Sequence, residues 1–237
     1  MAGNRPTLLL TRPAEPARRF LDEVRAAGGD LRAVISPLMA PRFIDVDLPD
    51  CEGIVFTSET AVAAVARLGG DRSALAWCVG PRTGAAAKTA GFPVIEGSGT
   101  AEDLARELAV RRPAGRLFCP LAQDQAFDIE MALNSAGIDT VSAVVYAQEP
   151  CPPTAEAISL MAATGPVILP LFSNRSARLA VATFRGHRAP LLIAAMTAGI
   201  AEAARDLDAE RVAIASSPDA AALARAILPL AEVRRSG

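Results

Sequence analysis

The sequence has few of the residues that most often carry enzyme chemistry. Its 237 residues include one histidine, one tyrosine and one tryptophan, and a single lysine, so 23 of the 24 basic residues are arginine. The histidine, His187, lies in Arg-Gly-His-Arg, which we expect to be a surface loop. No set of residues shows the pattern of nucleophilic catalysis. The arginine excess suits a substrate rich in carboxylates, because the guanidinium fork matches a carboxylate, but by itself it decides nothing.

Other absences narrow the class of protein. No apolar run approaches the roughly 18 residues of a membrane span, and the N-terminus leads into a strand rather than a signal-peptide pattern. No glycines have dinucleotide or phosphate-loop spacing. The net charge of −2 argues against a nucleic-acid binder. We therefore expect a cytoplasmic protein that binds neither membrane nor nucleic acid. Its cysteines lack metal-ligand spacing and are expected to be buried, reduced thiols: Cys51, Cys78, Cys119 and Cys151.

The chain is organised around residues 53–91, which predict strand, helix, strand, helix. Ile54 to Phe56 is a short apolar run of the kind that buried parallel strands need, and Ser58 is a good N-cap for the Ala/Val-rich segment after it. The second strand ends at Val79, and Gly80-Pro81 begins the next helix. Two helix N-termini should thus emerge at the carboxyl ends of adjacent strands. That edge of an open α/β sheet binds ligands, and its free N–H groups favour anions.

This block occurs twice. Ser58 and its flanking strand and helix repeat around Ser173, at an offset of 115 residues, and the strand and turn at 76–83 repeat at 191–199. The opening segment from Thr7 to Asp30 also aligns without a gap to residues 116–139, at an offset of 109. The repeat unit is about half the chain, far longer than a solenoid repeat. The sequence therefore predicts a duplicated α/β domain.

Two proline-bounded segments, 36–49 and 146–153, occupy equivalent places in the two repeats. Both are candidate crossovers. If the chain crosses between lobes at both, one lobe comprises 1–36 and 150–237 and the other comprises 37–149. From the residues alone, two tandem lobes remain the alternative.

Several motifs resemble the uroporphyrinogen-III synthase family. They are Leu-Leu-Thr-Arg-Pro at 9–13, Val-Phe-Thr-Ser at 55–58, Val-Gly-Pro-Arg-Thr at 79–83, Val-Val-Tyr at 144–146, Phe-Ser at 172–173 and Ser-Pro-Asp-Ala-Ala-Ala-Leu at 217–223. The resemblance covers nearly the whole chain. It implies two similar flavodoxin-like lobes with parallel sheets, a two-stranded β connector in the swapped arrangement, a cleft between the lobes, a monomer and no cofactor.

The resemblance also implies an activity. Enzymes of this family close hydroxymethylbilane, a linear tetrapyrrole, to uroporphyrinogen III with inversion of ring D and loss of water, in haem biosynthesis. The second copy departs from the family pattern, because Thr197 stands where the family has glycine, and residues 120–124 also differ. A small-anion-binding protein of two lobes and an inactive synthase-like module are the competing hypotheses.

These considerations give a set of candidate site residues. We expect the helix-capping loops to face one cleft and to hold substrate carboxylates. The substrate-binding candidates are Arg12, Thr57, Ser58, Gly80, Thr83, Ser173, Asn174 and Thr197. The alternative is that the hydroxyl residues only cap their helices.

Tyr146 is the one catalytic candidate. It is the only tyrosine and it ends a β-prone run just before the Pro-rich segment, which places it near the junction of the lobes rather than deep in either core. A phenol keeps its proton at neutral pH and can therefore donate to the departing hydroxyl of the substrate. The alternative is that Tyr146 only packs its ring.

Overall fold

The computed structural model describes residues 5–125 and 127–232. The chain divides into two compact units: the first unit comprises Met1–Ala40 and Pro150–Gly237, and the second comprises Pro41–Glu149. The first boundary follows Ala40, whereas the sequence pattern placed it after Ser36. Among the described residues, no helix is long and apolar enough to cross a membrane.

The first unit is built on a five-stranded parallel sheet. Its strands are β1 (Thr7–Leu10), β2 (Ala33–Ile35), β9 (Val167–Leu171), β10 (Leu191–Ala195) and β11 (Arg211–Ile214). They lie in the order β11-β10-β9-β1-β2, and all the pairs are parallel. Counted along the unit, this is the 2-1-3-4-5 order of flavodoxin-like sheets. The sequence pattern does not predict β11, because Arg-Val-Ala-Ile has no apolar and polar alternation and its Val212 and Ile214 are half-exposed.

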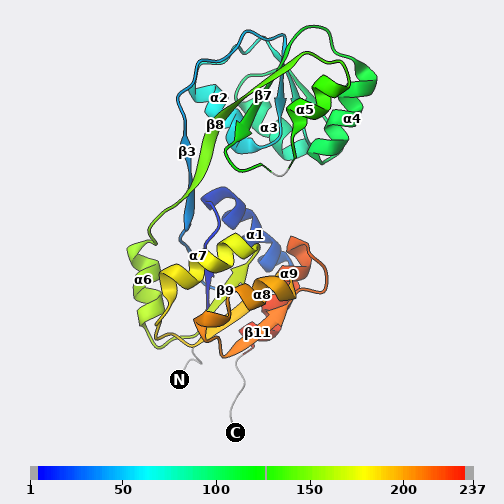
Figure 1. Cartoon of the computed structure of the whole chain (residues 1–237). Coiled ribbons are helices and arrows are strands. Elements are labelled where there is room, and N and C mark those ends of the chain that lie inside the picture. Colours follow the sequence, from blue (N-terminus) through cyan, green and yellow to red (C-terminus); the bar gives the residue numbers. More distant parts are fainter. Residues whose placement is uncertain (1–4, 126, 233–237) are drawn as a thin grey trace. The chain divides into compact units, whose positions relative to one another are not determined.

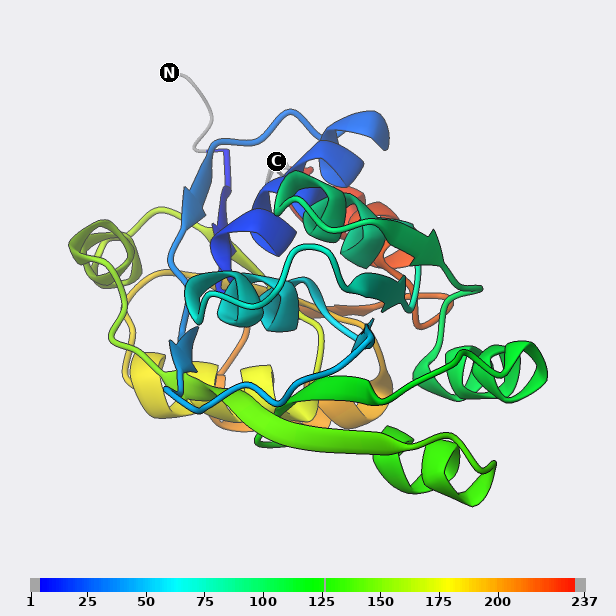
Figure 2. The same ribbon diagram turned by 90° about the horizontal axis from the view of Figure 1, so that it is seen from above.

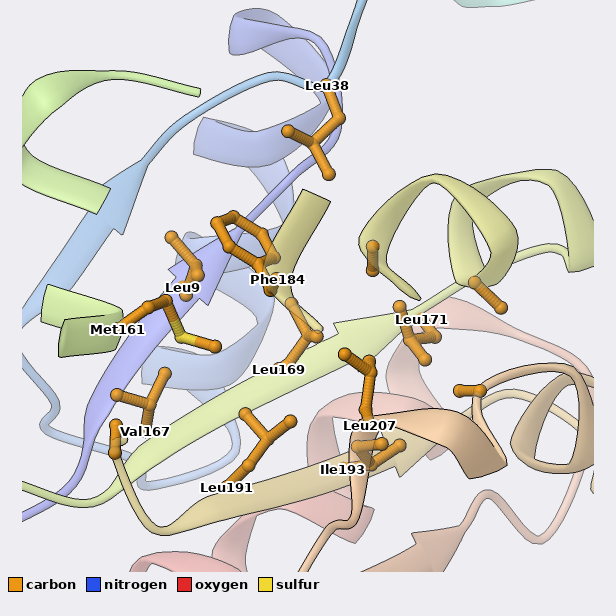
Figure 3. Packing of buried hydrophobic residues seen from close by; sticks show 14 of the residues in the cluster. Leu9, Leu38, Met161, Val167, Leu169, Leu171, Phe184, Leu191, Ile193 and Leu207 are labelled. Atoms are coloured by element: carbon orange, nitrogen blue, oxygen red, sulfur yellow. The ribbon is translucent and has the colours of Figure 1, made fainter. Parts of the chain in front are cut away.

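Helices cover both faces of this sheet. They are α1 (Ala14–Ala26), α6 (Ala155–Ala162), α7 (Asn174–Phe184), α8 (Ala198–Ala203) and α9 (Ala220–Ala231), with a 3₁₀ turn at Arg205–Leu207. Alternate strand residues point to opposite faces. Leu9 and Leu169 therefore pack against α6 and α7, as Figure 3 shows for the residues around Met161 and Phe184. Leu8 belongs to the opposite core, with α1 and α9.

The second unit repeats this architecture. Its sheet contains β3 (Met39–Phe43), β4 (Gly53–Phe56), β5 (Leu75–Cys78), β6 (Val94–Glu96), β7 (Leu117–Ala122) and β8 (Thr140–Pro150), in the order β3-β8-β7-β4-β5-β6. Without β3, this spatial order matches that of the first unit, with β7 and β8 in the places of β1 and β2. The two strands that come first in one unit therefore come last in the other (Figure 1).

The strand registers agree with the duplication. In the second unit Gly53 pairs with Leu117, and in the first unit Ile168 pairs with Leu8. The offsets of 115 and 109 read from the sequence convert one pair into the other. The α/β fold class with two parallel-dominated sheets is confirmed.

The helices of the second unit also lie on both faces of its sheet. They are α2 (Glu59–Arg67), α3 (Pro81–Thr89), α4 (Ala101–Arg111) and α5 (Ile129–Ser135). Ile54 and Phe56 of β4 pack in one cluster with residues of α2 and α3. Val55, between them, packs in the other cluster with residues of α4 and α5. The side chains of the continuous apolar run at 54–56 thus pack in two cores, as expected for a strand buried on both faces.

Strands β3 and β8 form the two-stranded connector, and the chain passes between the units within both of them. Cys151 N–H donates to the Leu38 carbonyl at one end of the pair, and Ile44 N–H donates to the Val145 carbonyl at the other. The residue numbers of the bonded positions rise along β3 and fall along β8, so the two strands are antiparallel. The 11-residue strand β8 is easily followed in light green in Figure 2.

Candidate functional site

Each unit has a carboxyl edge, formed by the C-terminal ends of its parallel strands. In both units, the two central strands pair only near their starts and are no longer paired at this edge. Strands β1 and β9 pair at two positions near their starts, and β4 and β7 do the same, whereas β9 and β10 pair along five residues. These two places are the topological switch points of the sheets, where ligands of open α/β folds bind. Most of the predicted site residues lie beside them.

In the second unit, Thr57 and Ser58 follow β4 at the switch point. Ser58 is the N-cap of α2: its backbone is extended, and its Oγ accepts a hydrogen bond from Ala61 N–H at 3.0 Å. Both Thr57 and Ser58 are half-buried. The cap satisfies one N–H group of the first helical turn, and the N-terminus of a helix is a place that favours anions.

Tyr146 reaches the same cap from β8. Its Oη lies 3.1 Å from Ser58 Oγ, and either atom can donate. Tyr146 is 7% exposed and packs in the core of the second unit, in the cluster that contains Phe56. The expectation that Tyr146 does not lie deep in either core is therefore wrong: the residue is buried in the core of the second unit, while its hydroxyl reaches the carboxyl edge.

A β-bulge explains this placement. Leu121 pairs with Val144, but the next residue, Ala122, pairs with Tyr146, so Val145 is an extra residue on β8. In a regular strand, Val145 and Tyr146 would point to opposite faces. Here both belong to the same buried cluster. The bulge thus turns Tyr146 to the face of the sheet that α2 covers.

The start of α3 provides a further helix N-terminus in the second unit. Gly80 is its N-cap and Pro81 its first helical residue, as the sequence predicts. Thr83 differs from expectation, because it is 4% exposed and lies within the helix. Its hydroxyl is therefore not presented to solvent, and the N–H groups of this turn are the better anion ligands.

At the carboxyl edge of the first unit, an arginine guanidinium stacks on an aromatic ring. The Arg12 guanidinium lies over the Phe172 ring, with Cζ 4.1 Å from the centroid. Phe172 in turn contacts Phe20 of α1 edge-to-face, with 4.8 Å between centroids. Arg12 follows β1 and Phe172 follows β9, so the stack lies at the switch point. Stacking of this kind orients the plane of the guanidinium.

Two hydroxyl caps complete this edge. Ser173 caps α7 in a capping box, in which its Oγ accepts from Ser176 N–H and Ser176 Oγ accepts from Ser173 N–H. Thr197 caps α8 through Ile200 N–H, at 3.4 Å. Ser173, Asn174 and Thr197 are all exposed. These side chains are accessible to a ligand as well as serving as caps.

Cavities lie elsewhere in each unit. One of about 600 Å³, lined by Glu52, Arg116 and Asp139 among others, lies where β4, β7 and β8 begin, so it is at the opposite edge of the second sheet. Another, of about 220 Å³, is lined by residues of α6 and α7 and by His187. Neither cavity includes a predicted site residue.

His187 has a structural environment. The ring is half-buried, with Nδ1 2.8 Å from the Ala189 carbonyl oxygen and Nε2 2.6 Å from that of Leu207. Both ring nitrogens lie within hydrogen-bond distance of backbone carbonyls, so the ring packs between the loop before β10 and the 3₁₀ turn of the first unit. Among the described residues there is no group of three or more His, Cys, Asp or Glu side chains able to hold a metal.

Sequence reasoning missed two features of the site. Phe172 belonged to the repeated block, but nothing in the sequence indicated that it stacks with Arg12. The bulge at Val145 also has no local signature in the sequence, although residues 145–147 are three consecutive buried residues in β8. Only the pairing with β7 shows it.

Structural comparison finds similar folds. Uroporphyrinogen-III synthetase from Helicobacter pylori 26695 is 16% identical, with a TM-score of 0.63 over 95% of this chain and 99% of that chain. Wild-type uroporphyrinogen III synthase from the extremely thermophilic bacterium Thermus thermophilus is also 16% identical, with a TM-score of 0.39 over 96% of this chain and 100% of that chain. At such identity, the first likeness shows a shared fold and the second adds no argument.

Sequence comparison identifies the family. No curated protein matches the chain. The family model described as uroporphyrinogen-III synthase HemD matches residues 19–225, which is most of the chain and includes parts of both units. The chain belongs to the uroporphyrinogen-III synthase family.

Proposed function

We propose that this chain closes hydroxymethylbilane to uroporphyrinogen III, with inversion of ring D and loss of water, and that Tyr146 acts as the proton donor. Family membership supports the reaction. The observation that supports the donor is the position of the only phenol in the chain. Its Oη lies at the carboxyl edge of the second unit, 3.1 Å from the hydroxyl that caps α2.

The reaction begins with the loss of a hydroxyl group. Tyr146 Oη gives its proton to the hydroxymethyl oxygen and becomes a phenolate. The C–O bond breaks, water departs, and the substrate becomes an azafulvene cation. Attack by the substituted carbon of ring D gives a spiro intermediate, which fragments and recloses with ring D inverted. The carbon that closes the macrocycle then loses a proton, which restores the phenol. The sum is the loss of one water with no net oxidation, so no redox cofactor is needed.

The carboxylates of the substrate supply the positioning. Arg12 offers a bidentate donor, and the caps and first turns of the helices offer hydroxyl and N–H donors at Thr57, Ser58, Gly80, Ser173, Asn174 and Thr197. Thr83 contributes through the turn that contains it rather than through its hydroxyl. Holding a flexible chain in a reactive fold can supply about 7–11 kcal/mol of a barrier. Carboxylate binding is therefore a direct part of catalysis here.

We also infer that the two units act as the discontinuous lobe and the inserted lobe of one monomeric cytoplasmic enzyme. Support for a reducing compartment comes from the cysteines, all four of which are described and are free thiols. The crossing of the chain within both β3 and β8 supports the division into lobes.

The test is to supply hydroxymethylbilane and to separate the type I and type III products. Type III product at a rate proportional to enzyme concentration is expected. If the spontaneous type I isomer alone accumulates while the chain still binds tetrapyrrole carboxylates, the chain is an inactive synthase-like module. If neither turnover nor tetrapyrrole binding is seen, the small-anion-binding hypothesis takes its place.

A further inference from the structure

Ser58 Oγ has two hydrogen-bond partners. It accepts from Ala61 N–H at 3.0 Å, as the cap of α2, and lies 3.1 Å from Tyr146 Oη. A serine hydroxyl has one proton and two acceptor positions. With one acceptor position filled by the helix, Ser58 either donates its proton to Tyr146 or accepts the tyrosine proton in the remaining position.

The two arrangements differ in the proton that is available to the substrate. If Tyr146 donates to Ser58, the phenol proton is in a hydrogen bond within the protein and is not directed at the substrate. If Ser58 donates to Tyr146, the phenol proton is free to leave the pair. The second arrangement also suits the charge that develops, because a phenolate oxygen can accept from Ser58 but cannot donate to it. The Ala61 N–H at the N-terminus of α2 strengthens Ser58 as a donor through cooperative polarisation.

The backbone fixes both members of this pair. Ser58 is held by its cap geometry at the end of β4, and Tyr146 is turned toward α2 by the bulge at Val145. The hydroxyl at the equivalent position of the first unit, Ser173, instead bonds Ser176 within its own capping box. The serine–tyrosine pair is therefore specific to the second unit and does not follow from the repeated fold.

We propose that Ser58 is a positioning residue for Tyr146: it donates its hydroxyl proton to Tyr146 Oη, which directs the phenol proton to the departing hydroxyl of the substrate and stabilises the phenolate that remains. This inference rests on the proposed function of Tyr146. It changes the expected role of Ser58, since a hydroxyl that serves both the helix and the phenol has no further proton to give to a substrate carboxylate.

Activity of four variants gives the first test. Ser58→Ala removes the cap and the donor to Tyr146, and Ser58→Gly removes the donor but largely retains capping. Ser58→Thr restores both functions. We expect Ser58→Ala and Ser58→Gly to lower kcat about tenfold with KM unchanged, and Ser58→Thr to recover most of the activity. The control is Thr100→Ala, which removes the cap of α4 in the same unit and should lower Tm without changing kcat.

The same serine changes in a Tyr146→Phe background give the second test. If Ser58 acts through the phenol, Ser58→Ala should cause little further loss there, because coupled residues are not additive. Full additivity would overturn the inference, and so would an effect of Ser58→Ala on KM alone. If Tyr146→Phe itself leaves kcat unchanged, the proposed role of Tyr146 fails and this inference fails with it. A loss in Tyr146→Phe without one in Ser58→Ala overturns this inference only.

A spectroscopic measurement removes the dependence on activity. Because the chain has one tyrosine, labelling tyrosine with ¹³C at Cζ gives a single resonance. Loss of the Ser58 donor should move this resonance in Ser58→Ala and Ser58→Gly, and Ser58→Thr should return it. Thr100→Ala should leave it unchanged. An unmoved resonance in all the Ser58 variants would show that Ser58 does not hold the phenol.

Discussion

The two units share the order of their five common strands, and a serine caps the helix after the switch-point strand in each, but the chemistry at the two switch points differs. With the repeat offsets, Arg12 and Phe172 of the first unit correspond to Leu121 and Thr57 of the second. The first unit thus presents a guanidinium stacked on an aromatic ring. At its own switch point, the second unit presents a phenol bonded to a capping serine.

This difference shows which parts of a duplicated fold can diverge. The strands and caps are needed for each unit to fold, since they bury the core and satisfy helix N–H groups. The residues just after β1, β4 and β9 do not share a role in core packing or helix capping. They can therefore differ between the two units. We infer a division of labour, in which helix caps of both units bind anions, the stacked guanidinium is supplied by the first unit alone, and the proton donor by the second unit alone.

Tyr146→Phe should have the largest effect. It keeps the ring in the core and removes the donor, and a positioned general acid contributes about 10²–10⁴-fold. A reaction that depends strongly on folding the substrate loses less, so we expect a fall in kcat of about tenfold or more. The lost hydrogen bond is worth about 0.5–1.5 kcal/mol, so Tm should change by only a few degrees. Activity equal to that of the parent would remove Tyr146 from the mechanism.

Arg12→Gln should come next, and it should act on binding. A hydrogen bond to a charged group contributes about 1.5–3 kcal/mol, which corresponds to a rise in KM of about tenfold or more. The matched control is Arg18→Gln, an exposed arginine on α1 that pairs with Glu15. Equal KM values for the two variants would contradict an anion-binding role for the first unit.

A double change, Thr57→Ala with Ser173→Ala, should have a smaller effect. One hydroxyl is removed from each unit, and each neutral hydrogen bond is worth about 0.5–1.5 kcal/mol. We expect substrate binding to weaken severalfold without loss of the reaction, measured as KM beside each single variant. Tm should also fall, because Ser173 caps α7. If both binding and turnover stay at the parent level, the two hydroxyls have structural roles only.

The smallest effect concerns alkaline stability, and it should arise in the second unit. Burial, with the nearby Glu130 charge, raises the pKa of Cys119 to about 12. Above the ordinary thiol pKa the unfolded chain loses this proton while the folded unit keeps it, so stability should fall as the pH rises from about 9 toward 12.

Cys119→Ala tests this dependence through the free energy of unfolding between pH 8 and 10. The variant should lose less stability over that interval, by at most about 1.4 kcal/mol per pH unit. The control is Cys151→Ala in the first unit, where the thiol is half-buried. An identical pH slope in Cys119→Ala and the parent would count against the buried thiol as the cause.

The sequence predicts the local features of this structure well. Strands such as β4 and β9 are short apolar runs, and Ser58 and Ser173 are caps whose hydrogen bonds involve residues three positions away. Such features depend on neighbouring residues. The order and offset of the repeats also allowed the two parallel sheets to be expected.

The features that the sequence did not predict depend on contacts between distant residues. Tyr146 bonds Ser58 from 88 residues away, and its direction depends on a bulge that is defined only by pairing with β7. Arg12 stacks on Phe172 because β1 and β9, which are far apart in the sequence, are neighbours in the sheet. Thr83 looked like an exposed hydroxyl because its motif begins a helix, but its position on that helix is buried.

The division of labour is tested most directly by steady-state kinetics on hydroxymethylbilane with Tyr146→Phe and Arg12→Gln measured side by side. We predict that Tyr146→Phe lowers kcat about tenfold or more with KM near the parent value, and that Arg12→Gln raises KM about tenfold with kcat near the parent value. If both variants change the same parameter to the same extent, the two units do not divide binding and proton donation between them.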